Sequence, residues 1–92
     1  MTILSSTLYQ GQLQTILDSL ASEDIDATKK FKLYLDTIIL NMPSKAKKYK
    51  PSIYFEDENI RDIEHQGFTI IFLMQEASQT YTILGIVKKE LV

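Results

Sequence analysis

The stretch Phe68-Thr69-Ile70-Ile71-Phe72-Leu73-Met74 has the strongest β-strand pattern in this chain of 92 residues. Side chains of a strand point alternately to its two faces, so Phe68, Ile70, Phe72 and Met74 would share one face. Ile71 and Leu73 would lie on the other. Because both faces carry apolar side chains, the pattern predicts a central strand that is covered on both sides.

Shorter strand patterns surround this stretch. Residues 60–66 read as a weak strand, and Gly67 permits a tight connection from it into residue 68. Residues 81–87 read as a last strand, with Tyr81, Ile83 and Val87 on one face and Thr82, Leu84 and Ile86 on the other. Residues 52–55 are predicted to be a short strand or extended arm, and Ile3-Leu4 a short first strand.

The first half of the chain has helical periodicity instead. Apolar residues with helical spacing predict a helix over residues 7–21, with Ser5 or Ser6 as its cap: Tyr9, Leu13, Ile16, Leu17 and Leu20. Residues 22–26 interrupt the pattern and offer caps for a second helix. Its predicted apolar stripe is Ala27, Phe31, Tyr34, Leu35, Ile38 and Met42, and Pro43 is expected to end it. Helices joined by so short a link should form an antiparallel hairpin.

These elements predict one α+β domain over residues 1–92, in the order β-α-α-β-β-β, with the helical hairpin packed on a small antiparallel sheet. The length fits a single domain. With no cysteine and one histidine, the chain has neither thiolate ligands nor an imidazole pair. Its three glycines are too far apart for a phosphate-binding loop. We therefore expect no cofactor and no metal site.

Charge is unevenly distributed along the chain. Residues 1–28 carry a net −4, residues 29–50 a net +6 and residues 51–92 a net −4. The middle segment contains Lys45, Lys47, Lys48 and Lys50, which form either a solvated loop or a contact for a polyanion or acidic partner. The longest apolar run, residues 70–74, is far shorter than the ~20 residues of a membrane span. We expect a cytoplasmic protein that does not bind membranes.

The remaining candidates for chemistry are basic. Arg61, Ile63 and His65 alternate and should share one face of their strand. Together with Lys88, cations there could stabilise an anionic transition state at a phosphodiester. The alternative for Arg61 is a salt bridge with a neighbouring acid. For Lys88 and Lys89 the alternative is a solubilising strand end, and for His65 a half-buried polar residue.

Together these segments resemble the RelE/ParE superfamily of type II toxins. The resemblance covers nearly the whole chain and rests on the order of its motifs, which are Leu13, Ile16 and Leu17, Ala27 and Phe31, Met42-Pro43, residues 49–52, 60–63, 67–72 and 83–86. It implies a toxin that a cognate antitoxin neutralises. RelE-like members cleave messenger RNA on the ribosome, whereas ParE-like members act on DNA gyrase.

Two departures favour the ParE-like branch. Thr69 occupies the position where RelE-like nucleases usually have an arginine, and residues 87–92 lack their aromatic or histidine acid/base. We therefore expect a toxin without catalysis of its own. The alternatives are a RelE-like nuclease that uses Arg61 and Lys88, and a non-toxic partner-binding domain.

The expected contacts follow from the same resemblance. The target, gyrase or ribosome, would contact a basic set consisting of Lys45, Lys47, Lys48, Lys50 and Lys89. The antitoxin would contact apolar side chains of the helices and apolar strand residues that face away from them, which are Leu73, Leu84 and Ile86. Without antitoxin, an uncovered apolar face should favour a homo-oligomer.

Overall fold

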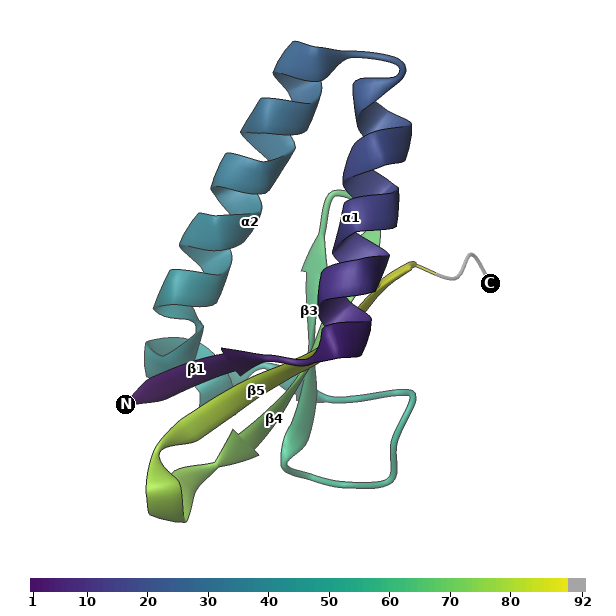
Figure 1. Ribbon diagram of the computed structural model, residues 1–92. Coiled ribbons are helices and arrows are strands. Elements are labelled where there is room, and N and C mark those ends of the chain that lie inside the picture. Colours follow the sequence, from purple (N-terminus) through teal and green to yellow (C-terminus); the bar gives the residue numbers. More distant parts are fainter. Residues whose placement is uncertain (90–92) are drawn as a thin grey trace.

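The computed structural model describes residues 1–89. In chain order its elements are β1 (Thr2–Ser5), α1 (Thr7–Ala21), α2 (Ile25–Lys45), the 3₁₀ turn η1 (Ala46–Lys48), β2 (Lys50–Pro51), β3 (Ile60–His65), β4 (Phe68–Gln75), the 3₁₀ turn η2 (Glu76–Ser78) and β5 (Thr80–Lys88). The two helices form an antiparallel hairpin beside the sheet (Figure 1). The predicted α+β class is confirmed.

The five strands form one sheet in the order β1-β5-β4-β3-β2. β4 therefore has a strand neighbour at each edge, which confirms the predicted central position. The helical hairpin packs on one of its two faces (Figure 1). The expectation of an all-antiparallel sheet is wrong at one edge, because β1 pairs with β5 in parallel, with Thr2 opposite Thr80. Alternation of apolar residues carries no information on strand direction, so the sequence pattern could not distinguish the two pairings.

Side-chain caps define the start of each helix. The Ser6 hydroxyl accepts a hydrogen bond from the Tyr9 amide at 3.0 Å, and it donates one to the Leu84 carbonyl at 2.8 Å. This residue therefore both begins α1 and ties it to β5. The Asp24 carboxylate accepts from the Ala27 amide at 3.0 Å and begins α2. Each cap contributes about 1 kcal/mol of helix stability.

The core lies between the helical hairpin and one face of the sheet. It contains Tyr9 and Leu13 of α1, Phe31, Leu35 and Met42 of α2, and Ile63, Ile70, Phe72, Met74, Ile83 and Ile86 of the strands. The predicted apolar stripe of α2 is wrong at two positions, because Ala27 and Tyr34 are exposed. Leu33 and Leu40 of α2 are exposed as well.

Pro43 does not end α2, which continues to Lys45. A proline at this position lacks the amide that would donate to the Ile39 carbonyl, and its ring crowds that carbonyl. Met42 and Pro43 are both buried, which offsets the cost of the missing hydrogen bond. Of the two alternatives for residues 52–55, a short strand or an extended arm, the strand is wrong. Pairing is confined to Lys50–Pro51, where an edge position tolerates a proline, and a loop follows.

A β-bulge in β5 changes which residues face the core. Ile70 pairs with Ile86 and Ile71 with Gly85, but Phe72 pairs with Ile83, so Leu84 has no partner in β4. An extra residue reverses the alternation beyond it. Ile86, which is 1% exposed, therefore shares the core face with Ile83. The alternation had predicted Val87 for that face.

The connection between β3 and β4 is the tight turn that Gly67 suggested. Gln66 and Gly67 have φ values of 47° and 85°. Positive φ at both central residues defines a type I′ turn, whose twist matches that of a hairpin. Within residues 1–89, neither helix combines the length and the apolar character needed to cross a bilayer.

Candidate functional site

Arg61 forms hydrogen bonds with three backbone carbonyls. Its Nε donates to Glu58 O at 2.7 Å, and its NH1 donates to Tyr49 O at 2.7 Å and to Lys47 O at 3.3 Å. None of the ion pairs among residues 1–89 includes this arginine. The guanidinium therefore joins β3 to the segment after α2, rather than to an acidic neighbour or an open surface.

His65 lies on the same face as Arg61, as predicted, but the helices cover that face. His65 is 9% exposed, and the centroid of its ring lies 5.3 Å from that of Phe31. Its Nε2 is buried without a hydrogen-bond partner in the described part of the chain. A histidine enclosed in this way does not reach a substrate on the surface.

The three catalytic candidates do not converge on one site. Arg61 pairs with Phe72 of β4, whereas His65 and Lys88 both pair with Phe68. Phe72 and Phe68 are four residues apart along β4, so Arg61 lies roughly 13 Å from His65 and Lys88 along the strand direction, at about 3.3 Å per residue. Lys88 is exposed at the end of β5. No acid/base pair is therefore assembled from these residues.

The basic set is brought together in part. Lys48, Lys50 and Lys89 line a hollow of about 540 Å³ on the sheet face away from the helices. Lys47 instead pairs with Glu76, with 3.4 Å between Nζ and Oε2, and Lys45 is exposed at the end of α2. Three of the five candidate target lysines thus share one depression.

Carboxylates offset the charge of these lysines. Asp62, Glu64 and Thr69 also line the hollow. Lys89 Nζ lies 2.9 Å from Glu64 Oε2, and Asp62 Oδ2 accepts from the Ile53 amide at 3.1 Å. A phosphate would therefore meet two acids here as well as three lysines, which weakens the electrostatic attraction for RNA.

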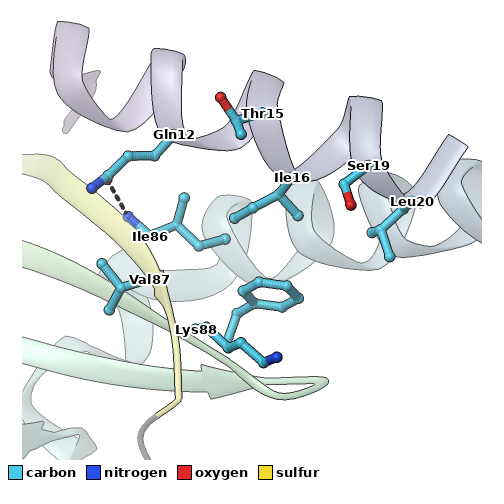
Figure 2. Close-up of a pocket in the computed structure, with 9 residues that line it drawn as sticks. Gln12, Thr15, Ile16, Ser19, Leu20, Ile86, Val87 and Lys88 are labelled. Atoms are coloured by element: carbon cyan, nitrogen blue, oxygen red, sulfur yellow. Dashed lines mark hydrogen bonds between the residues drawn. The ribbon is translucent and has the colours of Figure 1, made fainter. Parts of the chain in front are cut away.

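A second depression runs between α1 and β5, and the sequence did not reveal it (Figure 2). It measures about 610 Å³ and is lined by Gln12, Thr15, Ile16, Ser19, Leu20, Phe68, Ile86, Val87 and Lys88. Because β1 pairs only as far as Ile83, β5 beyond this point has a strand neighbour within residues 1–89 on one side only. We call this depression the α1–β5 groove.

One side chain of α1 occupies part of the free edge of β5. Gln12 Oε1 accepts a hydrogen bond from the Ile86 amide at 2.9 Å, in place of a strand carbonyl (Figure 2). A Cβ on Gly85 would lie 2.9 Å from that oxygen, so a larger residue would require the Gln12 amide to shift. A glycine inside an apolar strand often marks a close approach of this kind, and was the one sequence signal for the groove.

The three candidate antitoxin contacts differ in accessibility. Leu73 and Leu84 are half-buried and lie outside the core cluster. Ile86 is buried under α1, so the expectation that it faces away from the helices is wrong. The reason is the bulge at Leu84, which alternation alone does not reveal.

The pKa of one tyrosine of α1, Tyr9, is shifted from its ordinary value. Burial, with a smaller contribution from the negative charge of Asp36, raises the pKa of Tyr9 to about 12. The phenol therefore stays neutral at any physiological pH. Among residues 1–89, no three histidine or acidic side chains are grouped closely enough to hold a metal ion.

Comparison with known proteins gives a structural likeness. No protein-family model matches the sequence, and no curated protein matches it. The fold is similar to that of a chain in the structure entitled "Chromosomal ParDE TA system from P. aeruginosa". The TM-score is 0.76 at 16% sequence identity, over 98% of this chain and 97% of the other. The fold expected from the RelE/ParE resemblance is therefore confirmed.

Proposed function

We propose that this protein is the toxin of a type II toxin–antitoxin module and inhibits growth by a ParE-like action on DNA gyrase, without catalysis of its own. The observation that carries the proposal is the likeness in fold to a chain of a ParDE system, over nearly the full length of both chains. Gyrase action would place the protein in the cytoplasm.

The arrangement of the basic residues supports a non-catalytic action. Arg61 is engaged by backbone carbonyls, and His65 is enclosed by the core. Lys88 lies four strand residues from the row of Arg61. A nuclease needs an acid, a base and a cation around one phosphate, and these residues are not arranged in that way.

The α1–β5 groove is the proposed binding site for the cognate antitoxin. Its lining is mostly apolar, and the free edge of β5 borders it. Grooves take amphipathic helices, and free strand edges take added strands. Leu73 and Leu84 are proposed as further contacts. Without its antitoxin, the exposed groove should favour self-association, which sedimentation velocity would detect as a concentration-dependent increase in mass.

The test is a supercoiling assay with purified DNA gyrase. We expect the protein to inhibit supercoiling at micromolar concentration and to cause accumulation of cleaved DNA, and we expect expression to arrest growth. The Lys88→Ala variant should inhibit as the wild type does, because no catalytic role is assigned to Lys88. Harmless expression together with unaffected supercoiling would show that the proposed function is wrong and would favour a non-toxic binding domain.

Ribosome-dependent cleavage of messenger RNA is the second candidate. The observation in its favour is the hollow that Lys48, Lys50 and Lys89 line on the open sheet face. In this case expression would truncate messages, and Lys48→Ala/Lys50→Ala would prevent the truncation. Intact messages during growth arrest would exclude this candidate.

A further inference from the structure

The loop between β2 and β3, residues 52–59, presents large apolar side chains to water. Ile53 is 78% exposed and Phe55 is 46% exposed. The loop extends from the sheet on the side away from the helical hairpin (Figure 1). Loops of this size usually expose polar residues, so exposed isoleucine and phenylalanine in one short segment require an explanation.

Hydrogen bonds anchor this loop at both ends. At its start, the Ser52 amide donates to Ile60 O at 2.8 Å and the Ile53 amide donates to Asp62 Oδ2 at 3.1 Å. The Tyr54 amide then donates to Ser52 Oγ at 3.1 Å.

At its end, the Asp57 carboxylate accepts a hydrogen bond from the Asn59 amide at 2.8 Å, and the Asp57 carbonyl accepts one from the Ile60 amide at 3.0 Å. The Glu58 carbonyl accepts from Arg61 Nε. The apolar residues are thus held in place rather than exposed by a loosely ordered segment.

The acids of the loop are not paired within the described chain. Glu56, Asp57 and Glu58 are exposed, and the three ion pairs among residues 1–89 involve other residues. The loop has no basic residue of its own. The three acids directly follow Phe55 in the sequence, whereas Ile53 also lines the hollow that contains Lys48 and Lys50. Carboxylates beside the exposed Phe55 complement an apolar pocket with a basic rim, since rim charges steer association and the apolar centre supplies most of the affinity.

We propose that Ile53 and Phe55 insert into an apolar pocket, rimmed by lysine or arginine, on the protein that this chain inhibits. The inference rests on the proposed toxin function and names its target-facing surface. β2 and the β1–β5 edge lie at opposite ends of the strand order. Antitoxin in the α1–β5 groove and target at the loop would therefore use separate surfaces. A preorganised loop loses little conformational entropy on binding.

The experiment compares the double variant Ile53→Ser/Phe55→Ser with Leu33→Ser/Leu40→Ser. The control pair is exposed to a similar degree, on the outer face of α2. Both variants are first checked for an unchanged denaturation midpoint. Each is then measured for growth arrest and for inhibition of purified gyrase. We expect the loop variant to need at least tenfold more protein for half-inhibition, or about 1.4 kcal/mol, and the control to match the wild type.

A charge reversal tests the rim independently of apolar contacts. Glu56→Lys should weaken inhibition severalfold at low salt and less at high salt, because screening removes rim electrostatics. Glu23→Lys, in the exposed link between α1 and α2, is the matched control and should have no effect.

The outcomes separate this inference from the proposed function. If the wild type arrests growth and the loop variant does so equally well, the loop inference is overturned and the toxin function stands. If growth arrest occurs without gyrase inhibition, the growth readout still decides the role of the loop. If the wild type neither arrests growth nor inhibits gyrase, both proposals are wrong.

Discussion

Replacing Arg61, the only arginine of the chain, should destabilise the fold rather than remove a catalytic group. The hydrogen bond to the half-buried Tyr49 carbonyl should contribute about 1.5–2 kcal/mol. The bond to the exposed Glu58 carbonyl should contribute about 0.5–1 kcal/mol, because water can replace it. The longer bond to Lys47 adds little. We therefore expect Arg61→Ala to cost about 2–3 kcal/mol.

This loss is a large fraction of the free energy of unfolding of a 92-residue domain, roughly 5–14 kcal/mol. Urea denaturation followed by circular dichroism would measure it as a lower midpoint with an unchanged slope, and thermal denaturation as a decrease of about 10–20 °C. Arg61→Lys should recover less than half of the loss, since an ammonium group cannot reach carbonyls on both sides.

The matched control is Lys88→Ala, because Lys88 is exposed and forms no ion pair within residues 1–89. Its effect should stay within about 0.5 kcal/mol. An Arg61→Ala protein with the wild-type midpoint would refute the structural role, and it would return Arg61 to the candidates for phosphate binding.

Three further changes test the core, the α1–β5 contact and the phenol. Phe31→Ala should cost roughly 3–5 kcal/mol, because the ring is 4% exposed and packs on His65 and Phe68; an unchanged urea midpoint would contradict this packing. Gly85→Ala should displace the Gln12 amide and accelerate hydrogen exchange at Ile86, and its cost of about 1–2 kcal/mol should largely disappear in a Gln12→Ala background. Because the pKa of Tyr9 is raised from 10.0 to about 12, the folded state favours the neutral phenol. This contribution to stability is fully present below pH 10 and is lost between pH 10 and 12. At pH 11 the wild type should therefore lose about 1 kcal/mol more than Tyr9→Phe, relative to pH 8, and equal losses in urea denaturation would contradict the shift.

Local sequence patterns predicted a helix or strand well where a cap or the spacing of its apolar residues determines it. The α1 bounds follow from a serine cap and an apolar stripe, and β4 follows from alternation. Pro43 shows the limit of a local rule, because burial of Met42 and Pro43 carries α2 past it. The exposure of Tyr34 depends on how far α2 leans on the sheet, which periodicity does not contain.

The candidate site could not be predicted in the same way, because it is formed by contacts between residues that lie far apart in the sequence. The three carbonyls that bind Arg61 belong to residues up to 14 positions away. The α1–β5 groove depends on where β1 stops opposite β5. The burial of Ile86 depends on a single extra residue in β5. Lys48, Lys50 and Lys89 meet only because β5 returns beside β4.

The parallel pairing of β1 with β5 affects how the protein is made. Ser6 hydrogen-bonds to Leu84, 78 residues later, so β1 has no strand neighbour until β5 has left the ribosome. Closure of so large a loop comes late in folding. A growing chain that lacks β5 has neither its full sheet nor one wall of the α1–β5 groove. Synthesis of β5 therefore sets the moment at which the α1–β5 groove can form.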